Sequence, residues 1–595
     1  MDTHLRMGAR SSGAPGRFRT AIAAALAAVL VACGGSSDDD PPASAAAEMP
    51  ASRAEAARFL TQATFGPTEA EIDAVMAVGY GAWIDAQFAQ PATSHRAAWE
   101  SADAAAKAVS PTSDAGQDGV VNSFWQQAVA GPDQLRQRVA YALSQVFVIS
   151  MQDSAVGDNP RAVAAYMDLL GDRGLGNYRD LLEGVALHPM MGRYLSAMRN
   201  QKADARTGRV PDENFAREVM QLFSIGLHEL NPDGSVKQAN GAPVETYGAA
   251  DIAGMARVFT GWSWSCPEWP DSSCFYGGAS GGVSDPDREF KSMLGYPQYH
   301  STEEKKFLGR TIAPQSTSAP ADSLKQALDT LYEHPNVGPF IGKQLIQRLV
   351  TSNPSPQYVA AVTAAFDNNG AGVRGDMKAV VKAVLMHAEA RRSADTAGKL
   401  REPVLRLSAV LRAFGYRSDS GRYRVGTTDN AGTQLGQTPM RSPSVFNFYR
   451  PGYVPPGTLA GGAGLAVPEM QITHETTVSG YVNFMRDALQ YGVGHSNGTI
   501  NGVAYNRRDL QPDFTAELAL ADQPAQLLDR LDGKLMAGAM PAALKAEIQG
   551  AIEKIAIPAP NAAGTNQAQI DAARRTRINA AVLLTVVSPE FLVQK

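Results

Sequence analysis

Residues that mark familiar catalytic and metal sites are scarce in this sequence. It has only three cysteines and nine histidines among 595 residues, and the histidines are scattered without ligand spacing. The zinc-protease pattern HExxH, the nucleophile motif GxSxG, the Walker loop and the Rossmann glycine fingerprint are all absent. The sequence therefore predicts no metal site and no cofactor, and it singles out no serine nucleophile.

Blocks of basic residues are also absent. The chain carries 54 Lys and Arg residues against 59 Asp and Glu residues, so its formal net charge is −5. Proteins that bind nucleic acid concentrate positive charge to neutralise phosphates, and anionic membranes attract positive surfaces. We therefore expect no nucleic-acid partner and no electrostatic attraction to membrane lipids.

The apolar segment near the N-terminus is too short to cross a membrane. It covers residues 21–32, whereas a spanning helix needs about 20 apolar residues, and four arginines precede it. The segment ends in LVAC, which resembles a bacterial lipobox, whose cysteine receives a diacylglycerol. We expect residues 1–32 to be a signal peptide and Cys33 to be the lipidated first residue. The alternative is a plain secretory signal with an incidental cysteine.

The lipobox resemblance has consequences for location and domain layout. Gly34 follows the cysteine in place of an aspartate, which by this resemblance implies sorting to the outer membrane, at its periplasmic face or on the cell surface. Residues 33–50 are rich in Ser, Asp, Pro and Ala and predict a flexible tether. No strong boundary follows, so we expect residues 51–595 to form one large domain.

Two cysteines remain in the expected exported domain, Cys266 and Cys274. In an oxidising compartment, a closely spaced pair usually closes a small disulfide loop. The alternative, a metal site, needs further ligands, and no histidine lies close in sequence. We expect a disulfide between these two residues.

Apolar residues recur mostly at helical spacing, and strand signals are sparse. Thr68 and Glu71 form a capping box, and Gly79 suits the end of that helix. Further helical patterns cover residues 133–149, 212–225, 324–332, 337–350, 358–366, 376–387, 401–414, 524–536, 542–555 and 571–587, with a candidate strand pair near 423–425. The expected fold class is mainly α, a large helical domain with few short strands.

Two long stretches lack helical periodicity. Residues 262–311 contain three tryptophans, and residues 427–468 contain the run SVFNFYRPGY. Structureless loops longer than about 15 residues are usually functional or disordered, and the aromatic content favours order. We therefore expect long, ordered, aromatic-rich loops.

The segment PDENFAREVMQLF, which begins at Pro211, is the most informative in the chain. Proline fits the first turn of a helix, and Asp212 can cap it. A polar stripe at helical spacing follows, made of Asn214, Arg217, Glu218 and Gln221. This stripe is either a solvated face with one Arg–Glu pair or the wall of a cleft, with Glu213 or Glu218 as acid or base.

A second polar stripe consists of Gln344, Gln347, Arg348 and Thr351. Pro354 ends this helix and leaves Asn353 in an extended or turn conformation. His188 and His334 each precede a proline, where a histidine is usually a satisfied helix-end residue. In the other interpretation, His188 assists chemistry in a cleft.

Distinctive strings run in order along nearly all of residues 51–595. They are RFLTQATFGP from Arg58, LRQRVA from Leu135, HPM from His188, the segment 213–223, FTGW from Phe259, RLVTSNP from Arg348, REP from Arg401 and the segment 444–450. Together they resemble the bacterial domain-of-unknown-function 1800 family. The resemblance implies an exported, largely helical protein of uncharacterised activity, and it transfers no catalytic residues. It also implies a partner, because the family's genes commonly neighbour those of the domain-of-unknown-function 1501 family, whose members resemble sulfatases and phosphatases.

The leading expectation is an envelope protein, held on the membrane by its lipid, that binds a polysaccharide or a protein at the cell surface. Aromatic side chains in the loops would stack on sugar rings. One alternative is a hydrolase or lyase that acts on envelope or external polysaccharide with two carboxylates. The other is an assembly partner for the sulfatase-like neighbour.

The candidate residues follow from these stripes and strings. For catalysis they are Glu213, Glu218, Glu402 and His188. For ligand binding they are Asn214, Arg217, Gln221, Arg348, Asn353, Asn447 and Arg450. We expect both stripes to line one polar cavity. There Arg217 and Arg348 would be buried and would need carboxylate partners, for which Glu218 and Glu402 are the candidates, because an unpaired buried charge costs several kcal/mol.

Lipidation of Cys33 can be tested on the full chain expressed in a Gram-negative host. We expect the protein to partition with membranes and to incorporate a palmitate analogue, because combined acyl anchors hold a protein stably on a bilayer. Cys33→Ser should remove the label and either release the protein or leave it unprocessed. Membrane association without lipid label in the wild type would contradict lipidation.

Overall fold

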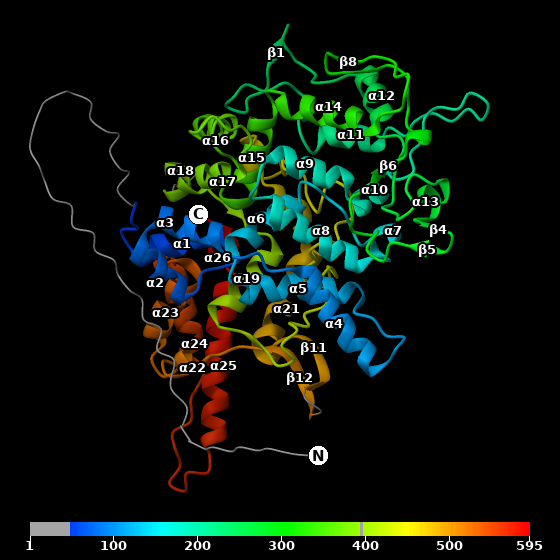
Figure 1. Cartoon of the computed structure of the whole chain (residues 1–595). Coiled ribbons are helices and arrows are strands. Elements are labelled where there is room, and N and C mark those ends of the chain that lie inside the picture. The colour runs from blue at the N-terminus through cyan, green and yellow to red at the C-terminus, as the bar shows by residue number, and fades with distance from the viewer. Residues whose placement is uncertain (1–47, 393–396, 501–502) are drawn as a thin grey trace, which may run out of the picture. The chain divides into compact units, whose positions relative to one another are not determined.

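Figure 1 shows the computed structural model of the chain, in which helices dominate. The structure describes residues 48–392, 397–500 and 503–595. The predicted signal peptide, Cys33 and most of the predicted tether lie outside these residues. Residues Ala47–Lys595 form one compact unit. Many helices and only short antiparallel strands confirm the prediction of a mainly α fold.

The last three residues of the predicted tether, 48–50, contact the body of the protein. The amide of Tyr80 donates a hydrogen bond to the Glu48 carbonyl at 3.2 Å, and Arg391 pairs with the Glu48 carboxylate. Pro50 is buried. These three residues therefore belong to the folded body, although their composition resembles that of the preceding segment.

Helix α6 (Gln134–Ser144) is buried on most sides and packs against five other helices. Its neighbours are α1 (Arg53–Ala63), α3 (Tyr80–Ala89), α5 (Gly116–Ala130), α8 (Pro160–Arg173) and α15 (Val337–Leu349). Leu135, Val139 and Leu143 are fully buried in this core, and so is the charged Arg138. A charge at this depth requires polar partners.

The remaining helices surround this centre. They are α2 (Glu69–Val78), α4 (His95–Val109), α7 (Ser154–Gly157), α9 (Tyr178–Leu187), α10 (Pro189–Tyr194), α11 (Asn214–Gln221), α12 (Ala249–Val258), α13 (Ser272–Gly277), α14 (Pro320–Glu333), α16 (Pro356–Asp367), α17 (Met377–Met386), α18 (Ala388–Arg391), α19 (Pro403–Ala413), α20 (Leu459–Gly462), α21 (Glu475–Tyr491), α22 (Thr515–Leu518), α23 (Pro524–Met536), α24 (Ala542–Glu553), α25 (Gln567–Val586) and α26 (Pro589–Leu592). Within the described residues, no helix has both the length and the apolar character needed to span a bilayer.

Capping chemistry defines α2 as the sequence predicts. The Thr68 hydroxyl accepts a hydrogen bond from the Glu71 amide at 3.3 Å, and the Glu71 carboxylate accepts one from the Thr68 amide at 3.1 Å. Gly79 ends the helix with φ of 82°. These local contacts confirm the predicted capping box.

The strands are short and antiparallel. Pairs form between β1 (Gln238–Ala239) and β2 (Ala242–Pro243), β3 (Trp262–Ser263) and β6 (Leu294–Gly295), β4 (Ala279–Ser280) and β5 (Val283–Ser284), β7 (Lys305–Phe307) and β8 (Arg310–Ile312), and β9 (Lys399–Leu400) and β13 (Val593–Gln594). A three-stranded sheet joins β10 (Arg417–Ser418), β12 (Val503–Gln511) and β11 (Val493–Ile500) in that order. Residues 423–425 form no strand, so the prediction of a strand pair there is wrong.

The first aromatic-rich stretch folds around the predicted disulfide. Cys266 and Cys274 are bonded, and they bury a small cluster with Phe275 and Tyr296. Trp262 is buried as well. The stretch is thus an ordered satellite core, and most of its aromatic rings are used in packing.

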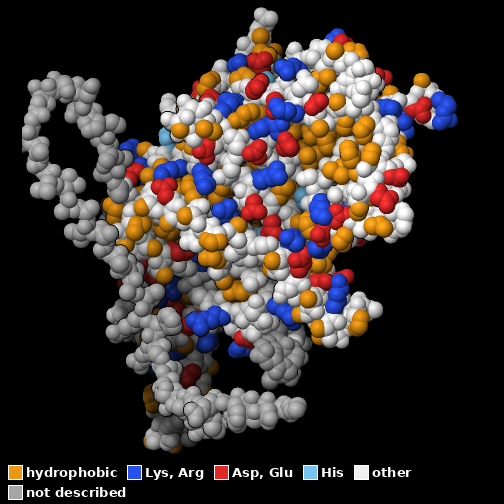
Figure 2. Space-filling model, in the orientation of Figure 1, with side chains coloured by type: hydrophobic (Ala, Val, Ile, Leu, Met, Phe, Trp, Pro, Cys, Tyr) orange, Lys and Arg blue, Asp and Glu red, His pale blue; other side chains and the backbone are white. Residues whose placement is uncertain are grey.

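On the face shown in Figure 2, Lys and Arg side chains are interspersed with Asp and Glu side chains, and no large area of one sign appears there. This distribution agrees with the near balance of charges in the sequence.

Candidate functional site

The first predicted stripe lies mostly on the outer side of α11. Asn214 and Arg217 are exposed, Gln221 is half-buried, and Arg217 pairs with Glu213 at 3.4 Å. The prediction that Arg217 is buried in a cavity is wrong, because Phe215 and the other apolar residues take the inner side of the helix. The arrangement favours the alternative of a solvated face with one Arg–Glu pair.

Glu218 is the buried member of that stripe. Glu218 is 8% exposed, and its Oε2 has no hydrogen-bond partner among the described residues. Burial raises the pKa of Glu218, and the charge of Arg217 partly offsets this effect. Arg348 lies instead beside Tyr449 and Glu402. The two stripes therefore occupy separate environments.

His188 is the N-cap of α10. Its Nδ1 accepts a hydrogen bond from the Met190 amide at 3.2 Å, and its ring packs edge-on against Tyr166. Burial lowers the pKa of His188 to about 3, so the ring is neutral at physiological pH. General acid–base catalysis works best with a pKa near the operating pH. These contacts favour the interpretation of His188 as a helix-end residue.

Glu402, at the start of α19, is the centre of a buried hydrogen-bond network. The residue is 1% exposed. Its Oε2 accepts hydrogen bonds from Tyr141 (3.0 Å), Gln145 (2.8 Å), Gln437 (2.6 Å) and Tyr449 (2.9 Å). Burial, reinforced by Glu402, raises the pKa of Tyr141, which therefore keeps its phenolic proton as a donor.

Two buried arginines, Arg138 and Arg348, lie close enough to this carboxylate to feel its charge. The Arg138 guanidinium donates to the Arg348 carbonyl at 2.6 Å, and the Lys399 ammonium donates to the same carbonyl at 3.0 Å. Lys399 also pairs with the buried Glu469 at 3.0 Å. Burial lowers the pKa of both Arg138 and Arg348, and the charge of Glu402 opposes that effect on each. We call Glu402, its four donors and these charged residues the Glu402 cluster.

Amide side chains complete the surroundings of Arg348. Gln347 donates to the carbonyls of Ser352 (3.0 Å) and Pro451 (3.2 Å), and it thereby joins α15 to the second long loop. Gln344 is also buried. Asn447 is buried with φ of 63°, and it lines a very small cavity of about 10 Å³ beside Gln145.

Asn353 and Arg450 lie at the edge of this region. Asn353 exchanges two hydrogen bonds with the backbone of Ala466, at 2.8 and 2.9 Å. Arg450 is exposed and lies over the ring of Phe446, 4.4 Å from its centroid. Both residues therefore hold the second long loop in place.

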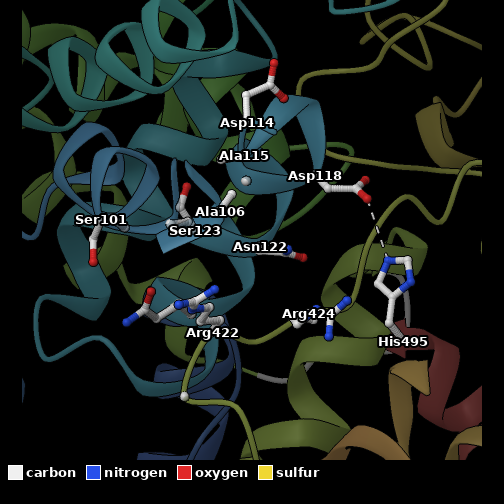
Figure 3. A pocket seen from close by; sticks show the side chains of 15 residues that line it. Ser101, Ala106, Asp114, Ala115, Asp118, Asn122, Ser123, Arg422, Arg424 and His495 are labelled. Carbon is white, nitrogen blue, oxygen red and sulfur yellow. Dashed lines mark ion pairs between the residues drawn. The ribbon is translucent and has the colours of Figure 1, made fainter. Parts of the chain in front are cut away.

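Another candidate site is a surface cleft that the sequence did not predict. It has a volume of about 380 Å³ and lies between α4, α5, residues 421–424 and His495 of β11. Figure 3 shows Asp118 pointing toward His495, 3.7 Å away, with Arg422 and Arg424 on the facing loop. We call this site the α4–α5 cleft.

Small side chains make the floor of the α4–α5 cleft. Ala98, Ala102 and Ala106 recur every four residues and so share one face of α4. Asn122 accepts a hydrogen bond from the Gly426 amide at 3.1 Å, which ties the facing loop to α5. The alanine spacing is the one sequence signal that points to this face.

Gly494 allows the β11–β12 hairpin to close one end of the α4–α5 cleft. A Cβ on Gly494, whose φ is 95°, would lie 2.3 Å from the Arg424 carbonyl oxygen. Without that atom, the His495 amide donates to the same oxygen at 2.8 Å. A second hollow of about 410 Å³ adjoins here, lined by His495 together with Val425, Thr433, Gln434, Phe484, Asp487, Gly494, Ser496 and Arg508.

Glu218→Gln tests the buried carboxyl group of α11. Because the folded-state pKa of Glu218 is raised, the stability it contributes is complete at low pH and falls as pH rises through that pKa. We expect E218Q to gain melting temperature relative to wild type on going from about pH 4 to about pH 8. The exposed Glu213→Gln is the matched control and should show no such gain. A difference between E218Q and wild type that does not change with pH would contradict the burial of an ionisable group there.

Comparison with known proteins agrees with the sequence strings. No curated protein and no solved structure matches the chain. A family model described as "Protein of unknown function (DUF1800)" matches residues 58–593. The match spans most of the chain, and the chain therefore belongs to the DUF1800 family of proteins of unknown function.

Proposed function

We propose that this protein is an envelope lipoprotein that binds a hydroxyl-rich polysaccharide in the α4–α5 cleft. The observation that carries the proposal is the lining of that cleft. Asp114 and Asp118 supply acceptors, Arg422 and Arg424 supply donors, and hydroxyl and amide side chains lie beside them.

This lining suits sugars because each sugar hydroxyl both donates and accepts hydrogen bonds. A carboxylate accepts from a hydroxyl, and a guanidinium donates to one. Ser101, Asn122 and Gln126 add groups that do both. The mixture of charges favours a neutral, polar ligand over a strongly anionic or cationic one.

The adjoining hollow supports a polymer rather than a single sugar. Each of the two hollows falls within the range of about 300–1,000 Å³ typical of small-ligand sites, and His495 lines both. A chain of several sugar units would pass from one hollow to the other over two consecutive residues, Arg424, which lines the α4–α5 cleft, and Val425, which lines the adjoining hollow.

The expected stacking of sugar rings on the 262–311 aromatics has less support. Trp262 and Trp264 are buried, and Phe275 belongs to the disulfide cluster. Trp269, which is 46% exposed, donates its indole N–H to the Gly295 carbonyl. We therefore assign recognition to hydrogen bonds in the cleft.

The alternative of a carboxylate-dependent hydrolase or lyase also has less support. Glu402 is nearly inaccessible and already accepts four hydrogen bonds, and Glu213 is engaged with Arg217 on the outer face of α11. Such an enzyme needs two carboxylates flanking one substrate. Assembly with a sulfatase-like protein is the remaining alternative, and no surface of the described residues singles it out.

Affinity electrophoresis through gels that contain dextran, alginate or soluble chitosan tests the proposal. We expect dextran to retard the wild type most, and Asp118→Asn and Arg422→Ala each to weaken its binding at least about ten-fold, which corresponds to about 1.4 kcal/mol. Both residues are accessible from the cleft, so the fold should be retained, as circular dichroism would show.

The matched controls are Asp85→Asn and Arg310→Ala, which alter exposed residues outside the cleft. They should bind like the wild type. Equal binding by all four variants, or no retardation by any of the three polymers, would contradict the proposal. Release of reducing ends from the polymer would favour the hydrolase instead.

A further inference from the structure

A second cleft lies where the C-terminal residues meet α1. It has a volume of about 210 Å³, and its lining comes from α1, the end of α23, Arg401 and the last residues of the chain. None of its residues lines the α4–α5 cleft. We call it the Arg401 cleft.

Arg401 is held rigidly at this cleft. Its amide donates to the Leu592 carbonyl at 2.8 Å, and its guanidinium donates to the Phe591 carbonyl. The guanidinium also lies over the Phe591 ring, 4.0 Å from the centroid. A guanidinium fixed in this way is pre-organised to present its remaining N–H groups.

The positive charge of Arg401 is not neutralised by an ion pair among the described residues. Arg401 is 5% exposed, and its Nε has no hydrogen-bond partner. Burial lowers the pKa of Arg401 to about 10, Tyr481 partly offsets this effect, and the neighbouring cation Arg406 adds to it. A buried guanidinium of this kind is unfavourable unless an anion joins it.

The other charged side chains of the lining, Arg58, Lys534, Lys595 and Glu590, leave a positive balance. Arg58 lies in the cleft, donates to the Arg391 carbonyl and forms no ion pair with a described carboxylate. Lys534 is paired with Glu517 at 3.0 Å, and Glu590 is the acidic side chain of the lining.

Gln594 adds an acceptor to these donors. Its Nε2 donates to the carbonyls of Leu349 (2.9 Å) and Val350 (3.1 Å), which fixes the orientation of the amide. Its buried Oε1 is left without a partner. Arg401 and Gln594 both line the cleft, so it brings together a donor and an acceptor that have no partner among the described residues.

We propose that the Arg401 cleft binds an oxyanion that carries an adjacent hydroxyl group, such as a hydrogen phosphate group or a sugar acid. The anionic oxygens would accept from the Arg401 Nε and from Arg58, and the hydroxyl would donate to the Gln594 Oε1. Arginine forks match carboxylate and phosphate oxygens in both charge and geometry. This site goes beyond the polysaccharide cleft and does not depend on it.

Isothermal titration of the protein with inorganic phosphate, with D-glucuronate and with D-glucose tests the site and distinguishes the two sources of the anion. We expect saturable binding of phosphate or glucuronate, with one site per chain, and no binding of glucose. Arg58→Gln should weaken anion binding at least about five-fold. Arg401→Lys, which keeps the charge but loses the planar fork of the guanidinium, should weaken anion binding further.

Arg310→Gln, which removes an exposed arginine of the β7–β8 hairpin, is the matched control and should bind like the wild type. Because Arg401→Lys has the greater risk of unfolding, Arg58→Gln alone decides the outcome. Absence of saturable anion binding by the wild type, or equal affinities of Arg58→Gln and Arg310→Gln, would overturn the proposal.

Discussion

The structure depends on how it accommodates the carboxylate of Glu402 at its centre. Four side chains, from α6, from its C-cap residue Gln145 and from the second long loop, donate to one oxygen of this group. A buried carboxylate is tolerable only when donors and opposite charges compensate its lost hydration. Arg138 and Arg348 supply the opposite charge. Burial lowers the pKa of each arginine, and the charge of Glu402 partly offsets that effect. The charged cluster thus requires α6, α15, α19 and the loop to assemble together.

Local signals in the sequence predicted the elements well where chemistry is local. The capping box at Thr68 defines α2, and α23 spans the predicted residues 524–536. The β11–β12 hairpin was missed, although the Asn501-Gly502 dipeptide in the sequence is a strong turn signal. Helix α11 is shorter than predicted, because the chain leaves helical geometry before Gly226, whose φ is 72°.

The Glu402 cluster and the two clefts were harder to predict because the residues of each are distant in sequence. Helical spacing places Arg217 and Arg348 on polar stripes, but it does not show that α11 turns its stripe outward while the end of α15 is enclosed. Arg138, Tyr141 and Gln145 do share one stripe of α6, which is the signal that could have led to the Glu402 cluster. The two clefts need contacts between segments hundreds of residues apart, so periodicity alone cannot locate them. The buried cluster thus supports the fold, and we propose that recognition takes place at the surface.

Equilibrium denaturation of Glu402→Gln by guanidinium chloride tests the structural role of Glu402 most directly. Removing one partner of a buried charge network typically costs about 3–5 kcal/mol. We expect Glu402→Gln to lose stability by that amount, and the variant that is still folded to be retarded by dextran like the wild type. The exposed Glu213→Gln should change the unfolding free energy by less than about 0.5 kcal/mol. Wild-type stability of Glu402→Gln combined with lost ligand binding would contradict this structural role, because it would make Glu402 a functional group rather than the support of the fold.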